Sequence, residues 1–158
     1  MKVATINLRT LTTSLLVPLA AGAASALISG ANSSKYAAMN QPPLSPPGWV
    51  FPVVWTILYL LMGYAAYRIR SAKSYEKDAA LRLYYIQLAI NVLWPIFFFR
   101  FQWPVASIFV LAALLIAVAL TFLQFRRIDR TAANLLIPYL IWLVFALYLN
   151  IGVAVLSR

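Results

Sequence analysis

The sequence predicts an all-α membrane protein, a bundle of five transmembrane helices in a single domain covering residues 1–158. Hydrophobic residues make up 64% of the chain and charged residues 10%, which leaves too little polar surface for a soluble domain. The apolar residues fall in continuous runs of about twenty, the length that crosses the hydrocarbon core as a helix. These runs lack the alternation of a transmembrane β-strand.

Five runs qualify as spans, at about 11–30, 50–67, 83–99, 105–125 and 135–156. The first is too long for a signal-peptide core and carries Pro18, so we interpret it as a retained span. The second has no charge before Arg68. The third is the least regular because Asn91 and Pro95 interrupt it. The fourth and fifth are long and free of charge.

A proline-rich stretch precedes the second span. Each proline from Pro42 to Pro47 fixes φ and lacks a backbone donor, so this stretch is a stiff loop. Trp49 and Trp55 follow directly. A rigid, aromatic-rich segment that leads into a membrane helix predicts a covered pocket.

The basic residues lie mainly on one side of the predicted membrane. Ten of the thirteen Lys and Arg residues precede the first span or lie in the second and fourth loops, Lys2 among them, and only Lys35, Arg100 and Arg158 lie opposite. The positive-inside rule then places the N-terminus in the cytoplasm and the proline-rich loop outside. The net charge of +10 reflects this topology, and we expect no nucleic-acid partner.

The polar composition excludes several kinds of chemistry. The chain has no cysteine and no histidine, so we expect no metal site and no cofactor that needs such ligands. Its three carboxylates, Glu76, Asp78 and Asp129, lie beside basic residues between the spans. A carboxylate proton relay inside the membrane therefore has no candidate.

Three spans carry aromatic or amide side chains at helical spacing, which places each set on one helix face. These are Trp55, Tyr59 and Met62 or Gly63 on the second span; Gln87, Asn91, Trp94 and Phe98 on the third; and Tyr139, Trp142, Ala146 and Asn150 on the fifth. Asn91 and Asn150 need polar partners inside an apolar span. Those partners are either neighbouring helices or a cavity, and the shared face with tryptophan favours a cavity wall.

Small residues recur on the first span at Gly22, Ala26 and Gly30. They allow close helix approach within the chain or at a dimer seam. An aromatic pocket with two amides and no acid suits a flat, hydrophobic, aromatic ligand. A carboxylate on that ligand would meet Lys35 near the mouth.

These residues resemble the TspO/MBR family, the tryptophan-rich sensory proteins related to the mitochondrial translocator protein, or peripheral benzodiazepine receptor. The resemblance is carried by the runs 46–55 (PPGWVFPVVW), 58–59, 62–64, 87–91 (QLAIN), 94–98 (WPIFF), 138–142 and 145–150. These motifs stand in family order and cover four of the five spans.

The resemblance implies a membrane-embedded homodimer of five-helix subunits that binds porphyrins such as protoporphyrin IX under the first loop. Some members bind benzodiazepine-type drugs or cholesterol, and some degrade protoporphyrin in light. The tryptophans important for that photochemistry match Trp55 and Trp142, and further pocket positions match Asn91, Trp94 and Ala146. The full set of expected ligand-binding residues is Trp49, Trp55, Tyr59, Gln87, Asn91, Trp94, Phe98, Tyr139, Trp142, Ala146 and Asn150.

One departure concerns sterols. The animal sterol motif has a tyrosine where this chain has Ile151, and the only base after Tyr148 is the distant Arg158. We therefore do not expect strong cholesterol binding. We expect a bacterial protein of the cell membrane, because no organelle-targeting extension precedes the first span.

Three functions fit these features. The favoured one is a porphyrin-binding sensor or regulator of tetrapyrrole metabolism. The second is an enzyme that degrades protoporphyrin with light and oxygen, in which Trp55 and Trp142 act on the photoexcited pigment. The third is a transporter of porphyrin or another lipophile, although five spans do not divide into equal repeats.

Overall fold

The computed structural model describes residues 5–31 and 33–157. Within these ranges the chain is helical, and five helical segments are long and apolar enough to cross a membrane. The helices are α1 (Leu8–Ser29), α2 (Ser33–Ala37), α3 (Val50–Ser71), α4 (Lys77–Pro95), η1 (Ile96–Arg100), α5 (Pro104–Ile128), α6 (Arg130–Asn134) and α7 (Ile137–Leu156). The predicted fold, an all-α bundle of five transmembrane helices, is confirmed.

The helices are longer than the apolar runs that predicted them. The third span begins at Lys77 instead of residue 83, and the second continues to Ser71 instead of residue 67. Arg68 and Arg70 thus lie in the last turn of α3, where cations favour the negative end of the helix dipole. Charged residues end an apolar run without ending the helix.

The interruption predicted in the third span is a change of helix type. After Pro95 the chain forms one π-helical turn, η1, closed by a hydrogen bond from the Phe101 N–H to the Ile96 carbonyl. Proline lacks an N–H and its ring displaces the carbonyl one turn earlier, which favours such a bulge. The span therefore continues to Arg100.

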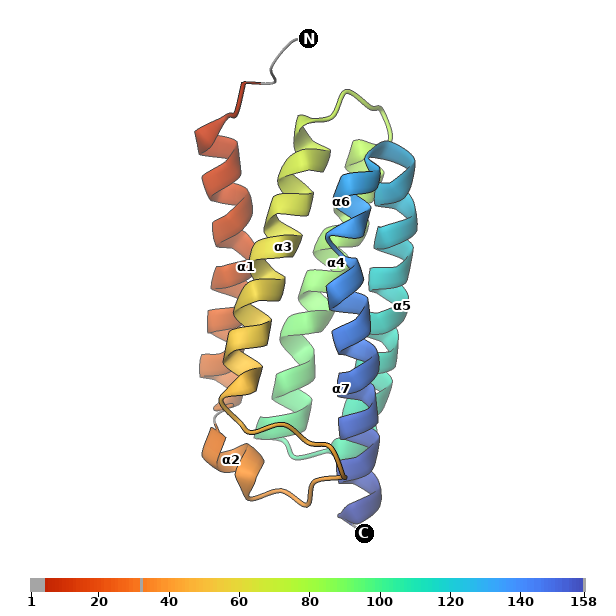
Figure 1. Ribbon diagram of the computed structural model, residues 1–158. Helices are drawn as coiled ribbons and strands as arrows, with labels where there is room; N and C mark the ends of the chain where they lie inside the picture. Colours follow the sequence, from red (N-terminus) through yellow and green to blue (C-terminus); the bar gives the residue numbers. More distant parts are fainter. Residues whose placement is uncertain (1–4, 32, 158) are drawn as a thin grey trace.

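The five long segments pack side by side (Figure 1). α1 packs against α3 and α4, and α5 packs against α4 and α7. α3 meets α6 but makes little backbone contact with α7. The α3–α4 connection lies at one end of the bundle, and α2, the first loop and the C-terminal end of α7 lie at the other.

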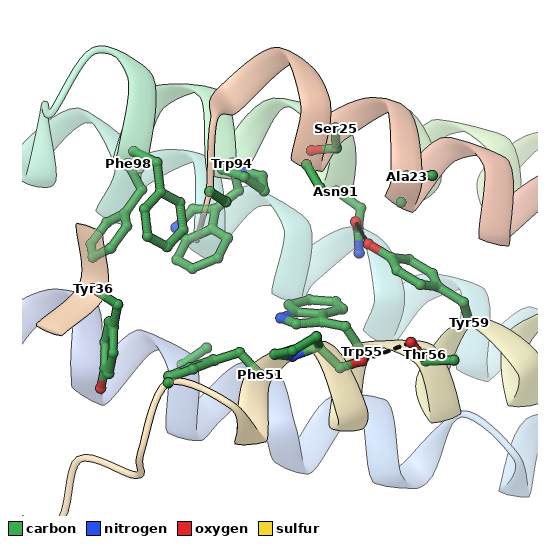
Figure 2. Close-up of a pocket in the computed structure, with 18 of the residues that line it drawn as sticks. Ala23, Ser25, Tyr36, Phe51, Trp55, Thr56, Tyr59, Asn91, Trp94 and Phe98 are labelled. Carbon is green, nitrogen blue, oxygen red and sulfur yellow. Dashed lines mark hydrogen bonds between the residues drawn. The ribbon is translucent and has the colours of Figure 1, made fainter. Parts of the chain in front are cut away.

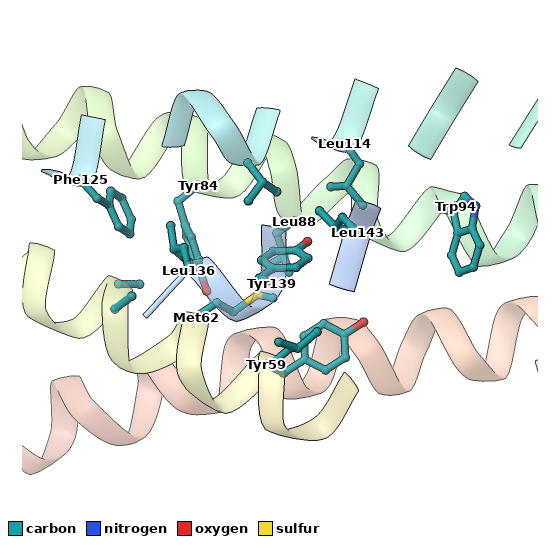
Figure 3. Packing of buried hydrophobic residues seen from close by; sticks show 14 of the residues in the cluster. Tyr59, Met62, Tyr84, Leu88, Trp94, Leu114, Phe125, Leu136, Tyr139 and Leu143 are labelled. Carbon is teal, nitrogen blue, oxygen red and sulfur yellow. The ribbon is translucent and has the colours of Figure 1, made fainter. Parts of the chain in front are cut away.

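The bundle core is tightest between the middle of α3 and its neighbours. Met62, Leu114 and Leu143 are fully buried there (Figure 3). Gly63 lets α1 approach α3, because a Cβ at this position would lie 2.6 Å from the Ser14 carbonyl oxygen. This close contact fixes α1 against the rest of the bundle.

Basic residues gather at the end of the bundle that carries the α3–α4 connection, and two ion pairs bind the connections there. Arg68 Nε lies 2.8 Å from Asp129 Oδ2, and Arg127 lies 3.2 Å from Glu76. Asp129 also caps α6 by accepting from two backbone N–H groups. Two of the basic residues used to predict the topology, Lys2 and Arg158, lie outside the described residues.

The pKa of Asp129 is set by opposing effects. Burial raises the pKa of its carboxyl, but the hydrogen bonds from Arg68 and from the Ala132 and Thr131 backbone outweigh burial and hold it below 3.8. The stability that this carboxylate contributes is therefore fully present above its ordinary pKa. It is lost as the pH falls through the lowered value.

We predict that Asp129→Asn lowers thermal stability at neutral pH by roughly 0.2–1 kcal/mol, because the partly exposed ion pair with Arg68 is lost. Asparagine still accepts the backbone hydrogen bonds of the α6 cap. The measurement is thermal unfolding in detergent as a function of pH. The difference from wild type should vanish at acid pH, and a difference that stays constant with pH would contradict the assignment.

The orientation predicted from charge can be tested because the chain has no cysteine of its own. Tyr75 in the α3–α4 connection is 97% exposed and Leu44 in the first loop is 86% exposed. We predict that an impermeant maleimide added to intact cells modifies Leu44→Cys and spares Tyr75→Cys until the membrane is permeabilised. The opposite labelling would place the basic end outside.

Candidate functional site

A cavity of about 500 Å³ lies inside the end of the bundle nearest α2. It is bounded by α1, α3, α4 with η1, and α7 (Figure 2). The described residues that line it include no acidic side chain and no Lys, Arg or His. The cavity therefore offers aromatic surface and neutral hydrogen-bonding groups.

Aromatic rings from α3 and from α4 with η1 face the space. On α3, Phe51, Trp55 and Tyr59 follow one another at four-residue spacing, so they share a face. Trp55 stacks on Tyr59 with ring centroids 5.6 Å apart. Across the cavity, Trp94 stacks on Phe98 at 5.2 Å, and the π-helical turn brings Phe99 to the same wall.

Small residues of α1 form another side of the cavity. Gly22, Ala23, Ser25 and Ala26 line it and leave room where larger side chains would fill the space. Gly22 also allows Tyr59 to pack directly on α1, because a Cβ at Gly22 would lie 2.3 Å from the Tyr59 ring. At Gly22 the small-residue series therefore serves packing within the chain.

A directional hydrogen-bond chain runs from the cavity wall into the core. The Tyr59 hydroxyl donates to Asn91 Oδ1 at 2.9 Å, and Asn91 Nδ2 donates to the Tyr139 hydroxyl at 2.6 Å. The Tyr139 hydroxyl in turn donates to Gln87 Oε1 at 2.8 Å. Asn91, Tyr139 and Gln87 are each at most 2% exposed, so the chain ties α3, α4 and α7 together inside the membrane.

A second set of hydrogen bonds joins α4, α7 and α5 beside the cavity. Trp94 Nε1 donates to Asn150 Oδ1 at 2.9 Å, and Asn150 Nδ2 donates to the Pro104 carbonyl at 3.0 Å. Pro104 is the first residue of α5, and its carbonyl also accepts a hydrogen bond from the Ser107 hydroxyl. Asn150 thus holds the Trp94 indole in place and fixes the start of α5 against α7.

The first loop, residues 38–49 between α2 and α3, closes the end of the bundle that holds the cavity. Pro42 packs on Gly152, where a Cβ would lie 2.3 Å from the Pro42 ring. The Tyr148 hydroxyl donates to the Pro43 carbonyl at 2.6 Å, and Asn40 donates to the Leu156 carbonyl. The loop is therefore fastened to α7, while Tyr36 of α2 packs on Phe51 at 4.6 Å.

The structure brings seven of the eleven predicted binding residues to the cavity: Trp55, Tyr59, Asn91, Trp94, Phe98, Ala146 and Asn150. Gln87 and Tyr139 lie behind the wall and support it through the hydrogen-bond chain. Trp49 is 65% exposed at the start of α3 and does not line the cavity. Trp142 does not line it either.

Trp142 differs from its predicted neighbours because of helix geometry. Tyr139, Ala146 and Asn150 fall within about 40° of one another around α7, whereas Trp142 is rotated by about 60° from Tyr139. That rotation places its indole on the side of α7 that faces α3. Trp142 contacts the Phe51 ring there at 5.7 Å.

Several lining residues were not among the predicted ones: Tyr36, Phe51 and Phe99, with the small residues of α1. Phe51 stands four residues before Trp55, so the spacing that identified Tyr59 could also have identified it. Tyr36 resembled an interfacial tyrosine in the sequence. It is 5% exposed, because α2 folds back over the cavity.

Comparison with known proteins identifies the family of this chain. Residues 14–156 match the sequence model of the TspO/MBR family. The chain belongs to the TspO/MBR family. It is therefore an integral membrane protein of five helices, as the structure also indicates.

Relatives with known names occur in several organisms. The chain is 35% identical over 154 residues to the tryptophan-rich protein TspO of Archaeoglobus fulgidus, covering 96% of this chain and 99% of that protein. It is 39% identical over 115 residues to the tryptophan-rich sensory protein of Cereibacter sphaeroides, covering 73% and 72%. It is 37% identical over 121 residues to the translocator protein of Ovis aries, covering 73% and 70%.

We predict that Asn91→Leu, which keeps the branched shape of the side chain, destabilises the protein by about 1–2 kcal/mol. The substitution leaves the Tyr59 hydroxyl without an acceptor and the Tyr139 hydroxyl without a donor. Tyr59→Phe is the matched control: it removes one hydrogen bond and leaves only Asn91 Oδ1 without a donor, so its effect should be smaller. Thermal unfolding in one detergent measures both, and an Asn91→Leu protein as stable as wild type would contradict the role of the chain.

Proposed function

We propose that this protein binds a flat aromatic tetrapyrrole, protoporphyrin IX, in the cavity and acts as a membrane sensor or regulator of tetrapyrrole metabolism. The observation that carries the proposal is the cavity itself. It is bounded by stacked aromatic pairs, Trp55 on Tyr59 and Trp94 on Phe98, and it lies within the bilayer-spanning part of the bundle.

The size and chemistry of the cavity support this ligand class. Its volume of about 500 Å³ lies within the range of roughly 300–1,000 Å³ typical of small-molecule sites. Indole and phenyl rings bind a conjugated macrocycle through stacking and apolar burial. Carboxylate groups of a porphyrin would point to the mouth, where Lys35 of α2 and Arg100 of η1 supply positive charge.

The polar groups at the cavity favour recognition over conventional catalysis. Asn91 and Asn150 are neutral and already hold structural hydrogen bonds, so neither can act as a general acid or base. The name of the Cereibacter sphaeroides relative, a sensory protein, agrees with a binding role. We accordingly favour a sensor over an enzyme.

Light-driven oxidation of the bound pigment by dioxygen is the second candidate. What favours it is the Trp55 ring, which lines the cavity and contacts both Tyr59 and Tyr139, with centroids 5.6 and 6.2 Å away. In this scheme the pigment absorbs the light and Trp55 exchanges an electron with it. Trp142 would act through the intervening Phe51 ring.

Further features of the assignment remain proposals. We propose residence in a bacterial cell membrane with the basic end in the cytoplasm, and assembly as a homodimer. Benzodiazepine-type drugs suit the same aromatic cavity. Strong cholesterol binding is not part of the proposal, because the sequence lacks the animal sterol motif.

We predict that Ala146→Phe weakens protoporphyrin binding by at least about tenfold, since the added ring fills space at the cavity wall. Val144→Phe is the matched control, because Val144 is 58% exposed and lies outside the cavity. Binding is measured by the Soret shift and by tryptophan quenching on titration. Equal affinities for both variants would remove the ligand from this cavity.

The photochemical candidate is tested by illuminating the protoporphyrin complex in air. We predict that Trp55→Phe slows product formation far more than it weakens binding, which should change by about two- to twelvefold. Product formation is followed by chromatography under matched occupancy. An unchanged rate would show that Trp55 is only part of the wall, and the sensor function would then stand alone.

A further inference from the structure

A second hollow lies on the outside of the bundle between α3 and α7. It has a volume of about 550 Å³ and is lined by apolar side chains alone, including Val54 and Ile57 from α3 and Ile141, Trp142 and Phe145 from α7. We call it the α3–α7 groove. Ile57 and Ile141 are 52% and 66% exposed, so the groove faces the surrounding bilayer.

One pair of aromatic rings separates this groove from the internal cavity. Phe51 lines the cavity, Trp142 lines the groove, and their rings meet edge to face with centroids 5.7 Å apart. Ala146, one turn beyond Trp142, lines the cavity again. The two hollows therefore lie on opposite sides of the Phe51–Trp142 pair.

Within the described part of the chain, the Trp142 indole lacks the hydrogen bond that fixes Trp94 in the cavity wall. Trp142 Nε1 has no hydrogen-bond partner among the residues that the structure describes, so turning this indole breaks no hydrogen bond. Trp94, in contrast, is fixed by its bond to Asn150. The backbones of α3 and α7 make little contact, so side chains close this side of the bundle.

The other ways into the cavity require more to be broken. Lifting the first loop would release Pro42 from Gly152 and break the hydrogen bond from Tyr148 to Pro43. Parting α1 from α3 would undo the packing of Tyr59 on Gly22. The α3–α7 side has neither kind of fastening.

We propose that the α3–α7 groove is a membrane vestibule for the cavity, and that the Phe51–Trp142 pair is the gate between them. Its occupant is a flat, apolar, aromatic ring system taken directly from the hydrocarbon core, the same ligand class as in the cavity. The all-apolar lining suits the ring system of such a ligand. This inference rests on the proposed function.

The test measures ligand exchange between the bilayer and the cavity. Protein in phosphatidylcholine nanodiscs is mixed in a stopped flow with phosphatidylcholine vesicles that contain protoporphyrin IX, and the Soret shift is followed. Dissociation is measured by mixing the loaded protein with excess pigment-free vesicles. Equilibrium affinity is measured separately.

Ile57→Trp narrows the groove without touching the cavity, because Ile57 lines only the groove. Association and dissociation should both slow by about tenfold while the affinity is unchanged, since a narrowed entry raises the barrier and not the depth of the bound state. Leu60→Trp, on the same helix and lining neither hollow, is the matched control and should leave both rates unchanged. Trp142→Ala removes half of the gate and should speed both rates.

If Ile57→Trp leaves the association and dissociation rates unchanged, the groove is not the entry to the cavity and only lipid occupies it. If Ile57→Trp does not fold, Trp142→Ala decides, and rates no faster than wild type refute the gate. A wild-type protein that binds no protoporphyrin refutes the proposed function and this inference together, whereas normal binding with unaltered rates refutes only the inference.

Discussion

A polar side chain inside a membrane bundle must find its partner within the protein, and the rest of this structure depends on how that constraint is met. The chain from Tyr59 through Asn91 and Tyr139 to Gln87 joins three helices by bonds of 2.6–2.9 Å. Each bond holds only if its helix keeps one rotation about its axis. That rotation also points Trp55 and Trp94 into the same space, so the network that stabilises the bundle positions the cavity wall.

The cavity exists because α1 contributes small residues to its wall while other helices contribute large aromatic rings. α1 supplies Gly22, Ala23 and Ala26, which bring its backbone near the space without filling it. On α3, Trp55 stacks on Tyr59, and across the cavity Trp94 stacks on Phe98. The rings of each pair therefore pack along their own side of the cavity and do not cross it. The first loop, fastened to α7 at Gly152, then covers the end.

The fold could be predicted from the sequence because apolar runs of this length match the thickness of the hydrocarbon core when they form helices. Part of the cavity wall could be predicted too, because Asn91 and Asn150 had to face inward and share their helix faces with Trp94 and Ala146. Trp142 could not be placed this way. Its offset from Tyr139 around α7 matters only once the position of α3 is known, and no spacing within one helix reveals that. Tyr36 was missed for a similar reason, since its burial depends on α2 folding back over the cavity.

In the proposed sensor, residues fixed by hydrogen bonds and residues without them should respond differently to a ligand. A ligand can shift a conformational equilibrium only where two arrangements lie close in free energy. Tyr59, Asn91 and Trp94 are fixed by hydrogen bonds within the bilayer, and changing their positions would leave buried polar groups unpaired. The Phe51 and Trp142 side chains make ring contacts, and Trp142 Nε1 has no hydrogen-bond partner among the described residues. Differences between the bound and free states should therefore concentrate at α2, the first loop and the α3–α7 side. The basic end, held by the Arg68–Asp129 ion pair, should change least.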